Sequence, residues 1–426
     1  MSFSEWKVIT FQESGLEIED GDRGKNYPNK SQLLREGYCP FLNNKNIAGD
    51  KLNFEETDFI TKEKDQLLRK GKAYRGDIIL TTRGSVGNVA LFDETIGYEF
   101  IRINSGMVII RNNDLFDLKF LYQQLKSPYM KTQYKNMSTG SAQPQLPIRD
   151  IRKLELLLPP LQEQKSIAHI LSTLDDKIEV NNQINKTLEN MAQATFKQWF
   201  VDFEFPNEDG EPYKSSGGEM VESELGMIPK GWEVRRIGDE CFCSLGGTPS
   251  RQKSDYWNGD IPWVNSGEVN NFRIYKPSEY ITKLGLEKSA TKLLKKKTTV
   301  LAITGATLGQ VSLLEIDTCT NQSVVGISEN DKISHVYIYP YVKSVIKKII
   351  GNQTGGAQQH INKGNVEDTK LLIPNKKVLN AYTKLVRPQY DLISSICFEN
   401  ELLTRLRDSL IPKLMSGEIR VPINNN

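Results

Sequence analysis

Residues 158–200 read LPPLQEQKSIAHILSTLDDKIEVNNQINKTLENMAQATFKQWF, and this stretch decides the fold. Between Leu161 and Phe200 it contains neither Gly nor Pro. The Pro pair at 159–160, followed by an acidic, amide-rich turn, is typical of a helix start. The stretch therefore predicts one helix of about 40 residues, which would be about 60 Å long at about 1.5 Å per residue. A helix of this length is a spacer or one half of a coiled coil.

Steps of four and three residues select one face of this helix, which is mostly apolar with two asparagines at its middle. The face consists of Ile167, Leu171, Leu174, Ile178, Asn181, Asn185, Leu188, Ala192, Thr195 and Trp199. Such a seam requires a partner helix. We expect Asn181 and Asn185 to fix the register of that pair, and the alternative is that they lie on an outward or frayed face.

The partner helix is an internal repeat of the first. Adding 215 to each residue number carries Leu-Leu-Leu-Pro at 156–159 onto Leu-Leu-Ile-Pro at 371–374, and Asn185 falls on Asn400. The seam positions become Tyr382, Val386, Gln389, Ile393, Ile396, Asn400, Leu403, Arg407, Leu410 and Leu414. A repeat of domain, helix, domain, helix predicts two antiparallel helices with a globular domain toward each end, related by a pseudo-two-fold axis.

The two segments that precede the helices also repeat. In the first, strand-like alternations at 77–82, 88–91 and 106–110 and a helical segment at 115–125 predict an α+β domain. Adding 222 carries Pro-Phe-Leu-Asn at 40–43 onto Pro-Trp-Val-Asn at 262–265, and Ile-Leu-Thr-Thr at 79–82 onto Leu-Ala-Ile-Thr at 301–304. Elsewhere identities are sparse, so we expect one scaffold with two different sets of loops.

The predicted fold class is α+β, with two similar α/β domains separated by two long antiparallel helices that form a coiled coil. The expected segments are a first domain at 1–158, a long helix at 159–205, a linker at 206–231, a second domain at 232–373 and a second long helix at 374–420. The linker is expected because its sequence is polar and spotted with Gly, Ser and Pro.

Composition narrows the class of protein. With 426 residues, 38% of them hydrophobic, the chain can bury more than one core. It has no apolar run of about 18 residues and no basic-then-apolar start, so we expect a soluble, unexported, cytoplasmic protein without a membrane partner. Five cysteines without CxxC spacing indicate reduced thiols. A formal charge of +2 neither requires nor excludes nucleic acid.

Catalytic constellations are not evident in the sequence. The acidic-x-Lys spacings at 163–165 and 175–177 lie on the long helix, where solvated charge decoration is the commoner explanation. The Gly-containing loops at 83–87 and 304–309 lack the Gly-Lys-Ser/Thr ending of a phosphate-binding loop. Three scattered histidines do not supply a zinc site. We therefore expect no enzyme activity, no cofactor and no metal.

Cations and amides gather instead in predicted loops, where Arg, Asn, Gln and Ser can pair with base edges and Lys can neutralise phosphate. The candidates for DNA binding are Lys25, Asn26, Tyr27, Asn43, Asn44, Lys45, Arg83, Ser85, Arg102 and Asn104 in the first domain, and Ser250, Arg251, Lys253, Tyr256, Trp257, Asn265, Ser266, Thr304, Thr307, Gln310 and Gln358 in the second. Such clusters are more often plain solvated surface, so composition alone does not establish DNA binding.

Four motifs, in order, resemble the specificity subunit of Type I restriction-modification enzymes. They are LPPLQEQ at 158–164, MAQATFKQWFVDF at 191–203, ELGMIPKGW at 224–232 and LRDSLIPKLMSGEI at 406–419. The resemblance covers nearly the whole chain and implies two target-recognition domains separated by two conserved helices. It implies a non-catalytic subunit that binds double-stranded DNA and two adenine-methylating modification subunits, which dock on the helices, and that restriction subunits can join.

Two prolines depart from the family pattern. Pro147 stands where the family's Gln-rich loop often continues with a small polar residue. Pro388 falls within the second long helix, where we expect it to interrupt or kink the rod.

The function expected from the resemblance is DNA sequence specificity, with each domain reading one half of a bipartite asymmetric target. Two alternatives stay open at the level of sequence. One is a coiled-coil scaffold or adaptor without DNA readout, and the other is a nuclease with an unrecognised site.

Overall fold

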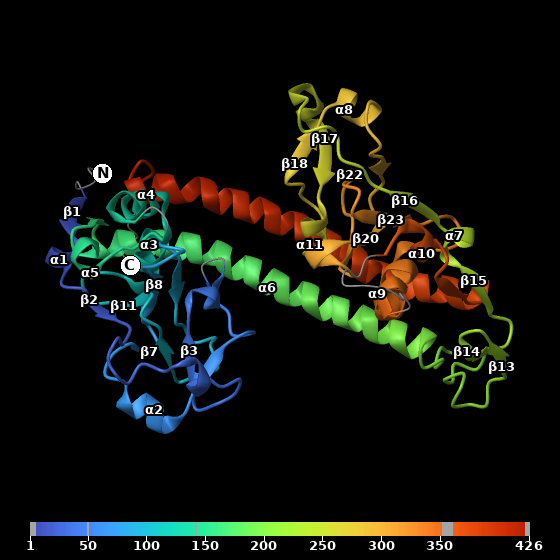
Figure 1. The fold of residues 1–426 in the computed structure, drawn as a ribbon, viewed down its shortest axis with the longest axis horizontal. Coiled ribbons are helices and arrows are strands. Elements are labelled where there is room, and N and C mark those ends of the chain that lie inside the picture. The colour runs from blue at the N-terminus through green and yellow to red at the C-terminus, as the bar shows by residue number, and fades with distance from the viewer. Residues whose placement is uncertain (1–5, 49–50, 141–142, 352–360, 422–426) are drawn as a thin grey trace. The chain divides into compact units, whose positions relative to one another are not determined.

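The structure, a computed structural model, describes residues 6–48, 51–140, 143–351 and 361–421. The chain forms two compact units: unit 1 consists of Met1–Glu179 and Leu402–Asn426, and unit 2 consists of Val180–Glu401. Each unit contains one mixed α/β domain and a part of both long helices, α6 and α11 (Figure 1). Among the described residues, no helix is both long enough and apolar enough to cross a membrane.

The two long helices are α6 (Leu161–Phe200, 40 residues) and α11 (Lys376–Ser416, 41 residues). The predicted helix pair is thereby confirmed. Pro388 does not interrupt α11, which contradicts the expected break. Pro388 is exposed, so water can satisfy the carbonyl that loses its helical hydrogen bond there.

Both helices contribute to the core of each unit, and within each unit they run antiparallel to each other. In unit 1, Ile167 and Leu171 near the start of α6 share a core with Leu414 near the end of α11. In unit 2, Trp199 near the end of α6 packs on Tyr382 near the start of α11, with ring centroids 5.7 Å apart. Every seam position selected from the sequence is buried or half-buried.

Asparagines occupy the seam where α6 and α11 meet within unit 2. Asn181 is 1% exposed, and its amide donates to Asn400 Oδ1 and to Glu399 Oε2, both at 2.8 Å. The Asn400 amide in turn donates to Asn182 Oδ1 at 2.9 Å. Asn185 is 4% exposed and faces Cys397. These side chains point inward, so the outward alternative is wrong, and their bonds require one register.

The α/β domain of unit 1 consists of two four-stranded sheets, in the orders β2-β11-β8-β9 and β6-β3-β10-β7. Their strands are β2 (Glu17–Asp20), β3 (Cys39–Leu42), β6 (Asp58–Ile60), β7 (Lys72–Tyr74), β8 (Ile78–Thr81), β9 (Val89–Leu91), β10 (Phe100–Ile103) and β11 (Met107–Arg111). Two further antiparallel pairs join β1 (Lys7–Thr10) to β12 (Glu155–Leu158) and β4 (Ile47–Ala48) to β5 (Lys51–Leu52).

Short helices cover the first of these sheets on the side of α6. The helical elements of unit 1 are α1 (Phe11–Ser14), η1 (Lys30–Gln32), η2 (Asn44–Asn46), α2 (Lys62–Leu67), α3 (Leu118–Lys126), α4 (Pro128–Met137) and α5 (Ile148–Ile151). One core forms between this sheet, α3, α4 and the long helices, and a second forms between the two sheets. The helix predicted at 115–125 starts later, at Leu118, because Asp117 accepts from the amide of Phe120 as an N-cap.

Unit 2 repeats this topology with the sheet orders β16-β23-β20-β21 and β18-β17-β22-β19. Its strands are β13 (Met220–Ser223), β14 (Gly226–Pro229), β15 (Glu233–Arg236), β16 (Phe242–Leu245), β17 (Trp257–Val264), β18 (Glu279–Ile281), β19 (Leu293–Leu294), β20 (Thr299–Ala302), β21 (Val311–Leu313), β22 (Thr318–Thr320), β23 (Val324–Ser328) and β24 (Lys370–Ile373). Its other helical elements are α7 (Ile237–Glu240), η3 (Ser254–Tyr256), η4 (Ser266–Asn270), α8 (Lys283–Glu287), η5 (Gly305–Thr307), α9 (His335–Gly351) and α10 (Lys363–Glu367).

One parallel strand pair marks the repeat residue by residue. In unit 1, β10 runs parallel to β3 with Ile103 opposite Leu42. In unit 2, β22 runs parallel to β17 with Thr320 opposite Val264. The predicted shared scaffold is therefore present in both units.

The segment expected to be a linker, 206–231, includes the hairpin β13–β14. Just before it, Phe205 stacks on Trp232 with ring centroids 5.1 Å apart. Its role as a linker stays a prediction.

Candidate nucleic-acid interface

The loops that follow β2, β3, β8 and β10 meet at one edge of the unit 1 domain, which we call the loop edge of unit 1 (21–24, 43–46, 82–87 and 104–106). The backbone amide of Asn104 donates to Leu42 O at 2.9 Å, and that of Thr82 donates to Gly106 O at 2.7 Å. The loops lie so close that a Cβ on Gly21 would stand 2.1 Å from the carbonyl oxygen of Asn104. Glycine is therefore required at position 21.

Four sequence-predicted residues come together on this edge: Asn43, Asn44, Arg83 and Asn104. The Asn44 amide donates to the carbonyl of Arg83, while Asn44 Oδ1 is buried and has no hydrogen-bond partner among the residues that the structure describes. The half-buried guanidinium of Arg83 has no ion pair among the described residues. Ser85 and Lys45 are exposed in the same loops. The edge thus presents cations, Arg83 and Lys45 among them, together with several amides, and Arg and Asn side chains are groups that hydrogen-bond to base edges.

The sequence did not single out Asp20, Arg23 or Gln145, which line a cavity of about 200 Å³ at this edge together with Arg83. Arg23 pairs with Asp20 at 2.9 Å and donates to the carbonyl of Ser105. Burial raises the pKa of Asp20 above its usual value, although Arg23 opposes the shift. Asp20 is the last residue of β2. Its position at the end of a strand was the one feature of the sequence that could have indicated a place on the loop edge.

Lys25, Asn26 and Tyr27 lie away from these four residues, toward α2 and the second sheet. The Asn26 amide donates to Leu67 O at 3.1 Å, and Tyr27 packs edge-on against Phe41 with ring centroids 5.7 Å apart. Lys25 is exposed.

Arg102 is not available to DNA, which corrects its place among the candidates. Its side chain is 6% exposed and its Nε lies 2.7 Å from Asp65 Oδ1. Its remaining donors go to the carbonyls of Lys70, Asp65 and Leu68. Burial alone would raise the pKa of Asp65, but the hydrogen bonds from Lys72 and Arg102 hold it below its usual value. Arg102 therefore ties α2 to β10.

The corresponding loop edge of unit 2 is made by residues 246–251, 265–270, 303–310 and 321–323. The Thr248 hydroxyl donates to Gln322 Oε1 at 2.6 Å across two of these loops. The amide of Asn321 donates to Val264 O at 3.1 Å, as that of Asn104 does to Leu42. Asn265, Ser266, Thr304, Thr307 and Gln310, all predicted, lie in these loops. Gln358, also predicted, lies outside the described residues.

A second group of predicted residues gathers around Trp257. The Arg251 guanidinium lies 3.6 Å from the centre of the Trp257 ring and pairs with Glu279 at its other side. Trp257 Nε1 donates to Ser250 O at 3.2 Å, and Lys253 Nζ donates to Tyr256 Oη at the same distance. Tyr256 is 7% exposed, so it supports Lys253 and does not itself offer a ring to solvent, which corrects its place among the candidates.

The sequence reasoning missed Asn321 and Gln322. The parallel pair β17–β22 places Thr320 where β3–β10 places Ile103, so Asn321 corresponds to Asn104. Adding 217 to residue 104 gives residue 321, which is also Asn. A match of one asparagine is too weak to be recognised without the strand pairing.

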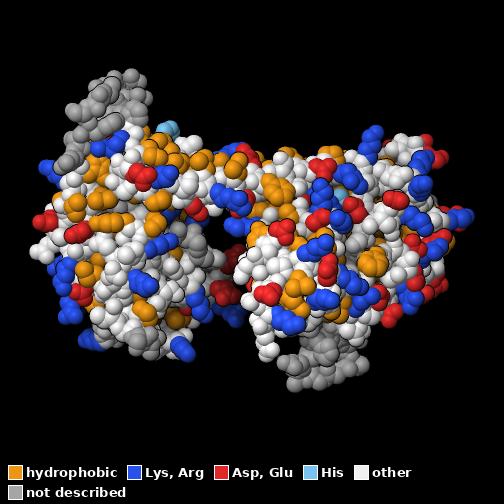
Figure 2. Space-filling view, turned by 90° about the horizontal axis from the view of Figure 1, so that it is seen from above, with side chains coloured by type: hydrophobic (Ala, Val, Ile, Leu, Met, Phe, Trp, Pro, Cys, Tyr) orange, Lys and Arg blue, Asp and Glu red, His pale blue; other side chains and the backbone are white. Residues whose placement is uncertain are grey.

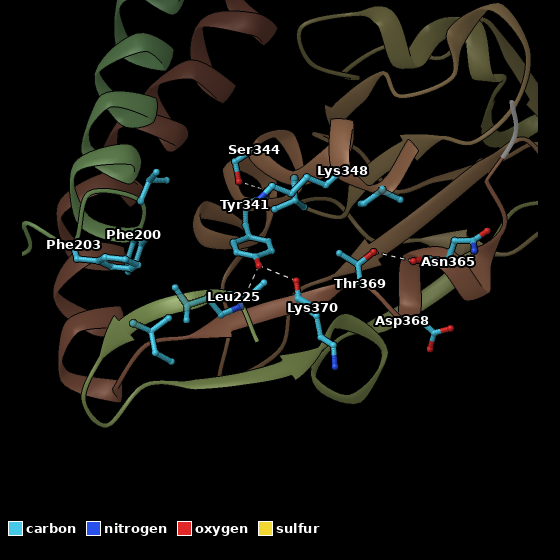
Figure 3. Close-up of a pocket in the computed structure, with 15 residues that line it drawn as sticks. Phe200, Phe203, Leu225, Tyr341, Ser344, Lys348, Asn365, Asp368, Thr369 and Lys370 are labelled. Atoms are coloured by element: carbon cyan, nitrogen blue, oxygen red, sulfur yellow. Dashed lines mark hydrogen bonds between the residues drawn. The ribbon is translucent and has the colours of Figure 1, made fainter. Parts of the chain in front are cut away.

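A cavity of unit 2 lies away from the loop edge, beside the end of α6 (Figure 3). It has a volume of about 640 Å³ and is lined mainly by Phe200, Phe203, Leu225 and Tyr341. The Tyr341 hydroxyl donates to Lys370 O at 2.8 Å. None of the predicted DNA residues lines it. Among the described residues, no group of three or more His, Cys, Asp or Glu side chains could hold a metal ion.

Charge is spread rather than concentrated on the face seen in Figure 2, where Lys and Arg are interspersed with Asp and Glu. A formal charge of +2 neither requires nor excludes attraction to DNA, so the local groups decide. Local groups at the loop edges must supply any attraction.

A family model described as the Type I restriction modification DNA specificity domain matches residues 4–190 and 229–383. The chain belongs to this family. The two matched segments fall on the two copies of the repeated fold, and the resemblance seen in the four motifs is confirmed.

Relatives extend the match over most of the chain. The Type I restriction enzyme MjaIX specificity subunit of Methanocaldococcus jannaschii is 30% identical over 82% of this chain and 78% of its own length. The HindI specificity subunit of Haemophilus influenzae is 26% identical over 98% of this chain and all of its own length. The S subunit of a Type I system from M. genitalium has a similar fold, with a TM-score of 0.58 at 16% identity, covering 96% of both chains.

Proposed function

We propose that this chain is the DNA-specificity subunit of a Type I restriction-modification complex and that each α/β domain reads one half of a bipartite asymmetric target. The observation that carries this proposal is the repeated scaffold with two different loop edges. Unit 1 offers Arg83 with Asn44 and Asn104, whereas unit 2 offers Thr304, Thr307 and Gln322. Arginine favours guanine, and Asn or Gln favours adenine, so different edges select different bases. The subunit itself is not catalytic.

The long helices are the proposed docking surface for the modification subunits. Beside its seam, each helix carries an exposed apolar stripe in which every residue directly precedes a seam residue. In unit 2 the stripe consists of Val180, Ile184 and Met191 on α6 and Leu385 and Leu392 on α11, and in unit 1 it includes Leu402 and Leu406 on α11. These side chains are 38% to 67% exposed. Large apolar residues at heptad spacing on a solvated face fit partner helices.

Replacing Ile184 and Met191 by Asp should weaken binding of the modification subunit at least about tenfold, because apolar anchors at interfaces are worth about 2 kcal/mol or more and 1.4 kcal/mol is tenfold. The midpoint of unfolding should hardly change, since both side chains are exposed. Titration of the purified chain with labelled modification subunit measures this. Asn190→Asp is the control, since it adds charge on the same helix outside the stripe. Equal binding by the double variant and the parent would exclude this stripe.

Reconstitution tests the proposed function as a whole. Purified chain mixed with its cognate modification subunits should direct adenine methylation to one bipartite sequence in a duplex library. A complex that assembles but neither binds nor methylates DNA sequence-specifically would favour the coiled-coil scaffold instead. Restriction subunits are not needed for this assay, and their presence and the stoichiometry of the complex follow from mass measurement of the assembled particle.

A further inference from the structure

A cleft of about 560 Å³ adjoins the loop edge of unit 1, between the β8–β9 turn and helix α4. The turn contributes Gly84, Val86, Gly87 and Asn88, the helix contributes Lys131 and Lys135, and its C-cap contributes Ser138. The cleft and the edge share Gly84, Val86 and Gly87. The Gly84 amide donates to Pro144 O at 3.0 Å, and Arg83 forms a β-bridge with Gln145. A ligand in this cleft would therefore lie directly beside the residues proposed to read bases.

The two lysines are positioned by the packing of α4. Its inward face consists of Met130 and Tyr134, which are 0% and 2% exposed. Tyr134 packs on Gly87 so closely that a Cβ there would stand 2.9 Å from its ring, and Gly87 has a φ of 92°. Lys131 and Lys135, four residues apart, follow these two residues on the helix and so share one face.

Both ammonium groups are available for an anion. Lys131 and Lys135 are exposed, and the residues that line the cleft include no Asp or Glu. Within the described part of the chain, neither lysine forms an ion pair. Two cations on one wall, next to the amides proposed to read bases, match the way proteins hold the DNA backbone beside a groove.

Unit 2 repeats the arrangement with one difference. Gly309, with a φ of 85°, packs under Ile350 and Ile346 of α9 as Gly87 packs under Tyr134. Lys343 and Lys347 flank Ile346 with the spacing that Lys131 and Lys135 have around Tyr134. Lys347 is exposed, but Lys343 Nζ is held 3.3 Å from Glu189 Oε1. Of these two lysines, only Lys347 is without an ion pair among the described residues of unit 2.

We propose that Lys131 and Lys135 form a binding site for backbone phosphates of duplex DNA, and that Lys347 is its reduced counterpart in unit 2. The inference rests on the proposed DNA-reading function and adds to it the groups that hold the backbone. Phosphate contacts set the position of a protein on DNA without selecting sequence. The first domain thus binds the DNA backbone with two cations, and the second domain binds it with one.

The test is the salt dependence of DNA binding by the complex with modification subunits, comparing the parent with Lys131→Gln/Lys135→Gln. Each phosphate neutralised contributes about 0.9 to the slope of log affinity against log salt concentration, so the double variant should be shallower by about 1.8. The affinity ratio of parent to variant should then shrink about 12-fold between about 50 and about 200 mM salt. The loss should be equal on target and non-target duplexes.

Lys7→Gln/Lys119→Gln is the matched control, because these exposed lysines on β1 and α3 do not line the cleft. It should leave the slope as in the parent. An unchanged slope in the cleft variant would overturn the proposal, and so would a loss confined to the target duplex. If the parent showed no preference for any sequence, the proposed function would fail, while the slope on non-target DNA would still decide the role of the lysines.

Discussion

Replacing Arg273 by Ala is expected to destabilise unit 2 by about 3–5 kcal/mol, because it removes a fully buried cation that pairs with two buried carboxylates. The Arg273 side chain is 0% exposed and lies 2.7 Å from Glu189 on α6 and 3.6 Å from Glu315 after β21. Burial disfavours its charged form, but Tyr339 and Glu189 hold the pKa of Arg273 above its ordinary value, so it stays charged. Urea unfolding followed by tryptophan fluorescence measures the loss.

The same cluster joins the second α/β domain to both long helices, which is why its loss should be large. Glu315 also accepts from Ser394 of α11 at 2.7 Å and pairs with Lys297 at 2.6 Å. Arg251→Ala is the control, because Arg251 also pairs with a carboxylate but is about half exposed, and such pairs are worth about 0–1 kcal/mol. Equal effects of the two substitutions would mean that the buried cluster does not hold the domain on the helices.

Exchanging residues 1–158 for the corresponding residues of a relative with another target should replace one half of the recognised sequence and leave the other half unchanged. The reason is that the loop edge of unit 1 is formed by strands β2, β3, β8 and β10, all within the exchanged segment. The edge of unit 2 is formed by strands between 242 and 320, which the exchange does not touch. Methylation of a duplex library by the reconstituted chimera measures both halves at once.

A matched exchange of residues 232–373 should alter the other half alone. A chimera in which both halves change together would show that the domains do not read independently. A chimera that keeps the parental target would place recognition outside the exchanged domain.

The long helices could be predicted closely because their signals are local, although the expected segments 159–205 and 374–420 extend a few residues beyond Leu161–Phe200 and Lys376–Ser416. The absence of Gly and Pro and the heptad spacing gave Leu161–Phe200 as the structure has it. The repeat at an offset of 215 gave the second helix, because Leu161 and Phe200 fall on Lys376 and Met415, within one residue of the bounds of α11. The break expected at Pro388 was wrong because a proline on an exposed helix face destabilises the helix less than a proline that leaves a buried carbonyl without a hydrogen bond.

The surface residues were harder to predict because their burial depends on distant partners. In the sequence, Arg102 has the features of a loop cation. In the structure its side chain is buried and donates to Asp65, which lies 37 positions away in the chain. Tyr256 is covered by the fold around β17 and α8 in a way that composition does not reveal. The loop edges form because β3 pairs with β10 and β17 pairs with β22 in parallel. The sequence pattern of a single strand does not predict which strand it pairs with.

The buried cluster of Glu189, Arg273 and Glu315 could not be predicted from the sequence. Glu189, Arg273 and Glu315 are far apart in the chain and each would be ordinary on a surface. Their meeting depends on how the second domain packs against α6, which is set by the whole core of unit 2.

Recognition of a bipartite target by this chain is tested most directly by methylation-sensitive sequencing of the genome of cells with and without the chain, in the presence of the modification subunit. We expect adenine methylation at one asymmetric sequence made of two short specific parts and a gap of fixed length, and we expect it to disappear when the chain is removed. An unchanged methylation pattern, or dependence on a single uninterrupted sequence, would contradict this expectation.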